Sequence, residues 1–550
     1  MTLLVDLFGY LSIIVHGLTI TAQSIALGSV LFLVFVARPI AWYLGADGGA
    51  IVRRTAHLAA WSALALILCE ASTVALEGSV LAGTVDLAPR EVLTAQFALA
   101  GLIKMGSAVL LALILFAAPR RSPAVLLLML ALLELAAATL TTHAAARLNY
   151  REYLLPIEVL HQLGAAIWIG GIPAFIIALA RVDNGAAWYA IIERFSPMCL
   201  LGVACIVLSG AAMSLFYIGA WDGFYGTAYG VMVSAKIAMF LGLLALGFGN
   251  YLTGRRLRRD TRTPITRLKR FAEVEIGVGI SIFFAAASLT SVAPAIDLMQ
   301  DRVSAQEIVE RLKPEWPPRL ASPDHDALAL PALQAKLDAE AAAQAQKQPP
   351  AFVPGSGEIP ARNAADIAWS EYNHHWAGIL VLAIGCLALL NQAGLRIARH
   401  WPVLFLVLAG FLFIRSDPEV WPLGQISFLD SLRDVEVLQH RFFVLLIAIF
   451  GLFEWWVRAR GVRGRPALVF PLVTAIGGAA LLTHSHAIAN IKDQLLIEIS
   501  HTPLALAGIT AAWARWLELR LDPPGSRRAG WVWPLAFLVV GFILLDYREA

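Results

Sequence analysis

The sequence has few charged residues for its length. Asp, Glu, Lys and Arg make up only 15% of its 550 residues, whereas 59% are hydrophobic and the mean hydropathy is +0.71. A water-soluble fold of this size does not hide so much apolar surface in its core. The composition therefore excludes a soluble protein and predicts a membrane protein that contacts the lipid bilayer, and we expect no nucleic-acid partner.

The sequence also has few cysteines and no Lys or Arg at its start, and both facts narrow the class of membrane protein. The sequence has only four cysteines, Cys69, Cys199, Cys205 and Cys386, and all lie inside apolar stretches. They do not indicate a disulfide framework, and packing between helices explains them most simply. The first twenty residues contain Asp6 and no Lys or Arg, so the basic start of a secretory signal is missing and we expect the first apolar helix to be retained.

Long apolar stretches make up most of the sequence. About 20 apolar residues cross a bilayer as a helix, and about fourteen such segments occur. We predict an all-α, polytopic transmembrane helical bundle: an eight-helix domain over 1–293, a linker over 294–370 with a short helix near 335–346, and a six-helix domain over 371–550. The predicted helices are 8–37, 55–77, 93–117, 122–146, 157–180, 196–219, 228–252 and 272–293, then 374–392, 399–415, 436–458, 464–486, 494–518 and 530–547.

Basic residues gather in the loops of one face. The clusters are Arg38 with Arg53 and Arg54, Arg120 with Arg121, the run from Arg255 to Arg270, Arg396 with Arg399, Arg458 to Arg465, and Arg515 to Arg528. Loops rich in Lys and Arg stay in the cytoplasm. Both termini and the linker are therefore predicted on the outer face.

Histidines gather toward that outer face. Nine of the twelve fall in or at the outer ends of the predicted helices: His16, His143, His161, His374, His375, His440, His484, His486 and His501. Imidazole is a common ligand for copper, zinc and iron, so the grouping predicts a metal or cofactor taken from the outer compartment. Interfacial histidines that bond loops and headgroups are the alternative.

The first half offers one structured motif for such a site. Glu158 and His161 are three residues apart, which places them on one helix face. A carboxylate there would hold the second ring nitrogen of a metal-bound histidine. His16 is the expected partner from the first helix. In the second half, His374, His375, His440, His484, His486 and His501 are predicted to form a second site, some with a Glu three or four residues earlier.

Polar and soft side chains deeper in the bilayer predict a transport path. A charge near the bilayer centre costs about 2.5–3.5 kcal/mol, so such residues are usually paired or functional. Glu70 or Glu134 with Lys104 or Lys236 would form an ion pair, and sulfur ligands suit Cu(I). The path residues are Cys69, Glu70, Lys104, Met105, Glu134, Met213 and Lys236. No Cys-x-x-Cys or Met-x-x-x-Met array accompanies them.

Several motifs in the first half resemble those of a known family. They are LHQLGAAIWIGG ending at Gly171, Glu193-Arg-Phe-Ser196, SGAAMSLFYIG at 209–219, the segment from Tyr229 to Lys236, Glu275, and LTSVAP at 289–294. In this order they resemble the CopD copper-resistance membrane proteins over roughly residues 150–295. The resemblance implies handling of periplasmic copper in a bacterial inner membrane, often beside a small periplasmic copper-binding protein.

Two functions compete at this stage. The first is a copper transporter rather than an enzyme, which accepts copper at the outer face. The chain has no G-x-x-x-x-G-K-[ST] motif, so transport would run on a gradient or on copper delivered by partners. The rival is a membrane redox protein with haem b, because facing histidines from neighbouring helices suit a bis-imidazole haem.

Overall fold

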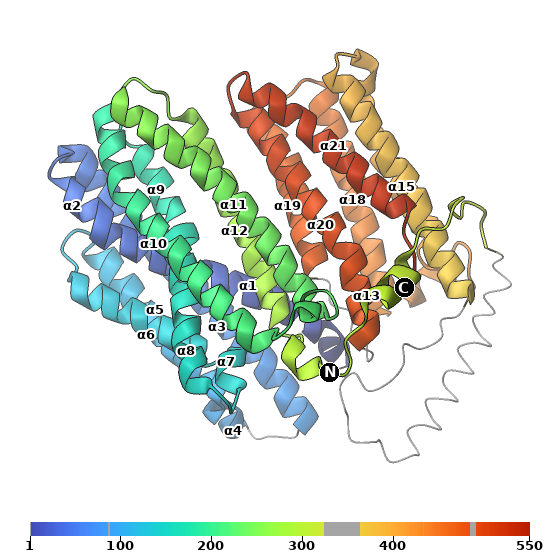
Figure 1. Ribbon diagram of the computed structural model, residues 1–550, viewed down its shortest axis with the longest axis horizontal. Helices are drawn as coiled ribbons and strands as arrows, with labels where there is room; N and C mark the ends of the chain where they lie inside the picture. The colour runs from blue at the N-terminus through green and yellow to red at the C-terminus, as the bar shows by residue number, and fades with distance from the viewer. Residues whose placement is uncertain (1, 86–88, 324–363, 433, 484–490, 550) are drawn as a thin grey trace. The chain divides into compact units, whose positions relative to one another are not determined.

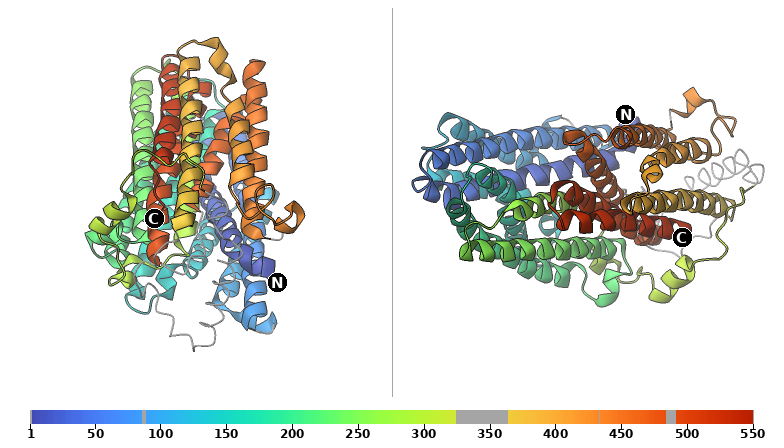
Figure 2. Two further views of the ribbon diagram at one scale, coloured as in Figure 1. Left: turned by 90° about the vertical axis from the view of Figure 1, so that its right-hand side faces the viewer. Right: turned by 90° about the horizontal axis from the view of Figure 1, so that it is seen from above.

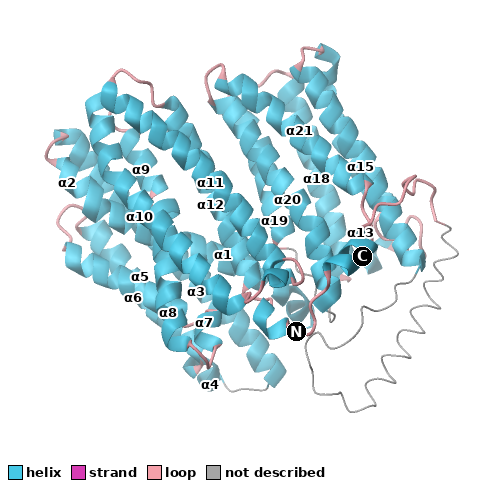
Figure 3. Ribbon diagram, viewed as in Figure 1, coloured by secondary structure: helices cyan, strands magenta, loops and turns pink. Residues whose placement is uncertain are grey.

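A computed structural model describes residues 2–85, 89–323, 364–432, 434–483 and 491–549. In these ranges the chain is helical, and Figure 3 shows helices and loops without a strand. The chain divides into two compact units. The first comprises 1–221, 233–297 and 482–485, and the second comprises 222–232, 298–481 and 486–550.

The first unit is a bundle of long apolar helices, most of them joined by short loops (Figure 1). Its α-helices are α1 (Thr2–Phe32), α2 (Arg38–Ala41), α3 (Gly45–Val85), α4 (Pro89–Thr94), α5 (Gln96–Ala117), α6 (Ala124–Thr139), α7 (His143–Ala146), α8 (Arg151–Ala165), α9 (Ile172–Leu179), α10 (Gly185–Tyr217), most of α11 (Ala228–Arg259) and α12 (Thr266–Leu289). Short π-helical turns, η1 (Leu33–Ala37) and η2 (Ala166–Gly170), join α1 to α2 and α8 to α9.

Small residues bring α1 against η2. A Cβ on Gly170 would collide with the carbonyl group of Ser24, and one on Gly28 would collide with the backbone of Ala166 and Gly170. Only glycine permits this approach, in the manner of small residues at transmembrane helix interfaces. The π turn of η2 therefore lies at a helix crossing, and such turns often mark functional positions.

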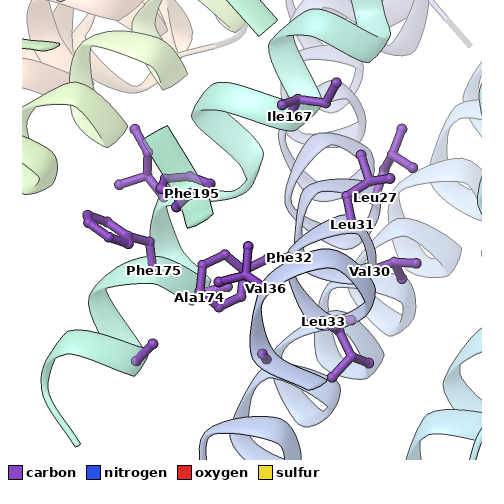
Figure 4. Close-up of a cluster of buried hydrophobic side chains, with 14 of the residues drawn as sticks. Leu27, Val30, Leu31, Phe32, Leu33, Val36, Ile167, Ala174, Phe175 and Phe195 are labelled. Carbon is purple, nitrogen blue, oxygen red and sulfur yellow. The ribbon is translucent and has the colours of Figure 1, made fainter. Parts of the chain in front are cut away.

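A continuous apolar core holds the first unit together. Phe32 packs edge-on against Phe195, with ring centroids 5.4 Å apart, and Phe175 stacks on Phe195 at 4.7 Å. Figure 4 shows this group of side chains between the ribbons of α1 and of the segment that holds Ile167, Ala174 and Phe175. The core thus fixes the position of η2, which directly follows the predicted Glu158 and His161 motif.

The second unit is built on the packing of α21 against two neighbours. Both α15 and α20 lie along α21, and α16 packs on α18; the two views of Figure 2 agree that α15, α20 and α21 run side by side. Its helices are α13 (Ala305–Leu312), α15 (Ala364–Gln392), α16 (Val403–Arg415), α17 (Phe428–Ser431), α18 (Val435–Ala459), α19 (Val469–Leu482), α20 (Ile491–Arg520) and α21 (Gly525–Leu545), with 3-10 turns η6 (Arg396–His400) and η7 (Arg465–Leu468).

The polytopic helical bundle predicted from the sequence is confirmed. Among the described residues, twelve helices are long and apolar enough to cross a membrane, and two shorter apolar helices, α6 and α16, match the remaining predicted segments. Several predicted boundaries were wrong: α3 and α10 are much longer than 55–77 and 196–219, and 122–146 contains α6 and the separate turn α7. The short helix predicted at 335–346 lies outside the described residues.

The predicted linker is not featureless where the structure describes it. Ser304 caps α13 by accepting a hydrogen bond from the Glu307 backbone at 3.2 Å, and α13 packs its apolar side on Leu496 of α20. Farther along, Arg319 bonds Glu371 of α15 at 3.3 Å. Residues 298–323 of the 294–370 segment therefore belong to the second unit.

Candidate functional site

The His161 ring in the first unit is held by a hydroxyl group. Its Nδ1 lies 2.9 Å from Oγ of Ser209 on α10, and this hydroxyl donates to the carbonyl of Cys205 at 2.5 Å. A hydroxyl has a single hydrogen. In the neutral ring, Nδ1 must then donate to Ser209, so Nε2 carries the lone pair that binds metals.

Two sulfur side chains share this face of α10. Cys205 and Met213 lie one helical turn before and after Ser209, and residues four apart stand above one another on a helix. The helix face beside His161 thus carries a thiol, a hydroxyl and a thioether in sequence. A Cβ on Gly164 would lie 2.9 Å from Cβ of Cys205, so α8 approaches α10 closely here.

The predicted support of His161 by Glu158 was wrong. Glu158 instead accepts a hydrogen bond from Nε2 of Gln162 at 2.9 Å, and Gln162 also lies 3.5 Å from Gln23 of α1. Lys236 on α11 interacts electrostatically with both Glu158 and His161. Glu158, His161 and Lys236 therefore share one polar region, but Ser209 holds the imidazole.

Four helices contribute to a second polar cluster in the first unit. Glu70 of α3 forms an ion pair with Lys104 of α5, and both are almost completely buried. Glu134 of α6 is 2% exposed, its Oε1 makes no hydrogen bond, and it interacts electrostatically with both members of the pair. His16 of α1 also interacts with Lys104. The structure thus associates His16 with the Glu70 and Lys104 pair, and its predicted pairing with His161 stays a prediction.

The remaining residues named for the first unit have separate surroundings. Nε2 of His143 lies 3.2 Å from the carbonyl of Leu289, and its ring lies beside Tyr217. Cys69 and Met105 are half-buried neighbours of the Glu70 and Lys104 pair. Their role in a path stays a prediction.

The buried carboxylate of Glu275, which lies outside the predicted site, accepts a hydrogen bond from the LHQLGAAIWIGG motif. Glu275 of α12 accepts hydrogen bonds from Nε1 of Trp168 at 3.1 Å and from Nδ2 of Asn250 at 2.6 Å. It is 3% exposed. Trp168 lies in η2, so this bond anchors the π turn.

In the second unit the structure brings two predicted histidines together. Nδ1 of His374 lies 2.9 Å from the carbonyl of Ser370, and Nδ1 of His501 lies 2.9 Å from the carbonyl of Ile497. The two rings are perpendicular with centroids 6.3 Å apart, and the Tyr547 ring stacks on His374 at 3.8 Å. Each ring is thus oriented by the carbonyl one turn earlier on its own helix.

Other histidines of the second unit have different partners. His375 has both ring nitrogens against carbonyl oxygens, those of Arg319 at 3.1 Å and Tyr547 at 3.0 Å, which ties three segments together. Nδ1 of His440 lies 2.6 Å from Oδ1 of the buried Asp417. His484 and His486 lie outside the described residues, so the predicted six-histidine site is tested only in part.

The described ranges contain no group of three His, Cys, Asp or Glu side chains placed to hold a metal ion. Sequence reasoning missed Ser209, Asp417 and Tyr547, each distant in sequence from the histidine it contacts. The sequence held a signal only for Ser209, which stands in the SGAAMSLFYIG segment.

The fold and the polar groups first define a class. This is a multi-pass helical membrane protein whose first unit buries an ion pair, an unbonded carboxyl oxygen and an oriented imidazole among apolar helices. Buried ionisable groups of this kind usually mark a pathway or a binding site within the membrane.

Comparison with known proteins then finds a likeness over part of the first unit. Residues 189–289 match the family described as CopD, copper resistance protein D, so the resemblance predicted from the sequence is confirmed for this part of the chain. A protein named copper transport protein CutJ, from Bacillus subtilis strain 168, is 33% identical over 161 residues. The match covers 28% of each protein. No solved structure matches the chain.

Proposed function

We propose that this protein transports copper across the bacterial inner membrane and accepts it at the outer face on His161. The observation that carries the proposal is the hydrogen-bond chain from His161 through Ser209 to the carbonyl of Cys205. It leaves Nε2 as the ring atom with a lone pair. The CopD match covers Ser209, and the relative named for copper transport supports copper as the cargo.

The neighbouring groups favour Cu(I). Met213 offers a thioether on the outer side of Ser209, and Cys205 offers a sulfur on the inner side, on the same face of α10. Soft sulfur ligands and imidazole suit this ion. Copper moves along this face from Met213 to His161 and then toward Cys205, while Glu158 and Lys236 provide nearby charge.

A second copper site belongs to this proposal. His374 and His501 lie on different helices, and both rings are oriented by backbone carbonyls. Their centroid separation of 6.3 Å allows one ion to bridge two ring nitrogens after a small rotation. A periplasmic copper-binding protein that delivers the ion is the partner we propose, as expected for the CopD family.

The test compares His161→Ala with His57→Ala in the purified full chain. His57 lies in α3 of the same unit, near Phe116, and has no place in the proposed site. Cu(I) affinity is measured anaerobically by competition with a Cu(I)-selective chelator, and copper uptake is measured in proteoliposomes. We expect H161A to weaken binding and slow uptake while H57A changes neither. Unchanged binding and uptake in a folded H161A protein would overturn the assignment.

A further inference from the structure

A basic pocket opens at one end of the second unit. It has a volume of about 600 Å³ and lies where α18 ends, α19 begins and α20 ends, within the orange to red part of Figure 1. Five arginines and one glutamate line it: Arg458, Arg463, Arg465, Arg515, Arg520 and Glu518. Neither proposed copper site includes any of these residues.

The pocket has an excess of positive charge. Arg515 pairs with Glu518 at 2.6 Å, and Arg458 pairs with Glu454 at 2.5 Å. Arg463 and Arg465 are exposed, and within the described part of the chain neither forms an ion pair. The pocket is therefore suited to an anion.

Arg458, one of the lining residues, has an unused hydrogen-bond donor. The Arg458 side chain is 10% exposed, and its buried Nη2 makes no hydrogen bond. Its guanidinium group is held over the ring of Trp401 at 4.6 Å and near that of Trp533 at 5.3 Å. This packing fixes the orientation of Arg458 before any ligand arrives, so an anion that accepts from Nη2 would satisfy an otherwise unmet buried donor.

Tryptophans near the pocket in sequence favour a position at the membrane surface. Trp455 and Trp456 precede Arg458 on α18, Trp516 precedes Arg520 on α20, and Trp531 lies near the start of α21. Tryptophan concentrates at membrane interfaces, and loops rich in arginine face the cytoplasm. Trp455, Trp456 and Trp531 are 36%, 40% and 44% exposed, as expected for side chains that contact lipid.

We propose that this pocket binds the headgroup of an anionic phospholipid from the cytoplasmic leaflet. Arginine forks match phosphate oxygens, and basic pockets between transmembrane helices bind anionic headgroups. The exposed tryptophans beside Arg458 provide an apolar surface for the acyl chains, which a free phosphate ion would not use. This lipid joins α18, η7 and α20 at the ends where they meet.

The experiment uses the full chain in detergent, delipidated and then titrated with cardiolipin, phosphatidylglycerol or phosphatidylcholine. Bound lipid is counted by native mass spectrometry and thermal unfolding is followed in parallel. The test variant is Arg463→Gln/Arg465→Gln, in which two exposed side chains change. The control is Arg527→Gln/Arg528→Gln, which removes the same charge from exposed positions of α21 outside the pocket.

We expect the anionic lipids to bind and raise the unfolding temperature, phosphatidylcholine to do neither, and R463Q/R465Q to lower anionic-lipid occupancy several-fold. R527Q/R528Q should retain it. Equal losses in both variants would show general surface attraction and overturn the proposal, as would equal binding of phosphatidylcholine. If inorganic phosphate displaces the lipid and stabilises the protein equally well, the pocket is a free-anion site and the lipid assignment fails.

Discussion

The Ser209 hydroxyl decides which nitrogen of His161 faces a metal. Ser209→Ala removes the hydroxyl that accepts the Nδ1 proton and leaves the Ile206 backbone as the remaining hydrogen-bond partner of the ring, so the ring is held less firmly in one tautomer and orientation. Removal of such a supporting partner typically costs 10–100-fold in metal affinity. We expect Cu(I) affinity, measured by chelator competition, to fall by about 10-fold or more in this variant.

Ser214→Ala is the matched control for that change. Ser214 is also on α10 and bonds a carbonyl one turn earlier, that of Gly210, but it does not contact His161. Its loss should leave Cu(I) affinity unchanged. Equal affinities of S209A and S214A would contradict the role given to Ser209.

Spacing along the sequence could predict only part of this site. The three-residue interval correctly placed Glu158 and His161 on one helix, but Gln162 engages the carboxylate and the partner of His161 is 48 positions away. The same holds for His440, whose observed partner Asp417 lies before the helix. Sequence patterns identify neighbours on one helix, whereas these partners come together only when helices pack.

The buried ion pair of Glu70 and Lys104 gives a prediction about stability. Lys104→Met removes one charge and leaves Glu70 buried beside Glu134 without its ion-pair partner. Breaking a buried pair on one side typically costs about 3–5 kcal/mol. We therefore expect a much lower unfolding temperature for K104M in detergent.

The double variant E70Q/K104M separates charge from packing. With both charges removed, neither side chain is left as a buried ion without a partner. The unfolding temperature should therefore rise from that of K104M most of the way to that of the parent protein. If the double variant is less stable than K104M alone, then the Lys104 ammonium is not what compensates Glu70.

At the scale of the helices, the crossing of α1 and η2 depends on Gly170. A Cβ in Gly170→Ala would meet the backbone of Ser24, which cannot move as a side chain can. Overpacking of this kind typically costs about 1–3 kcal/mol. We expect a lower unfolding temperature and weaker Cu(I) binding, because the shift of η2 also displaces His161 at the end of α8.

Gly106→Ala in α5 provides the comparison. No atom lies within 4 Å of a Cβ built at Gly106, and alanine favours a helix by about 1 kcal/mol over glycine. G106A should be as stable as the parent protein or slightly more so. If G106A lost as much stability as G170A, the loss in G170A could not be attributed to the close approach of α1 and η2.

Apolar length was enough to predict the transmembrane helices but not their ends. Residues 185–195 of α10 extend the helix before the predicted span although they include the charged Glu193 and Arg194, and Asn184 caps it by accepting from the Ala187 backbone at 2.8 Å. The π turn η2 has the same apolar composition as an α-helix. It lies in close contact with α1 at Ser24 and Gly28, and its own sequence does not reveal it.

For the whole molecule, the two proposed copper sites belong to different units and share no ligand. One is built on α8 and α10, the other on α15 and α20. Substitutions at independent sites have additive effects. H161A and H374A/H501A should therefore each remove about one equivalent of copper, and the combined variant about both.

Elemental analysis and a visible absorption spectrum of the purified chain, before and after anaerobic loading with Cu(I), test this prediction. Copper bound without a Soret band, and lost stepwise in the variants, is the result we expect. Haem b in a bis-imidazole site would instead give iron, a Soret band and no bound copper. Loss of that band in H374A/H501A would then assign the second-unit histidines to haem. The CopD match would in that case indicate only how the helices of the first unit fold, and not that the protein transports copper.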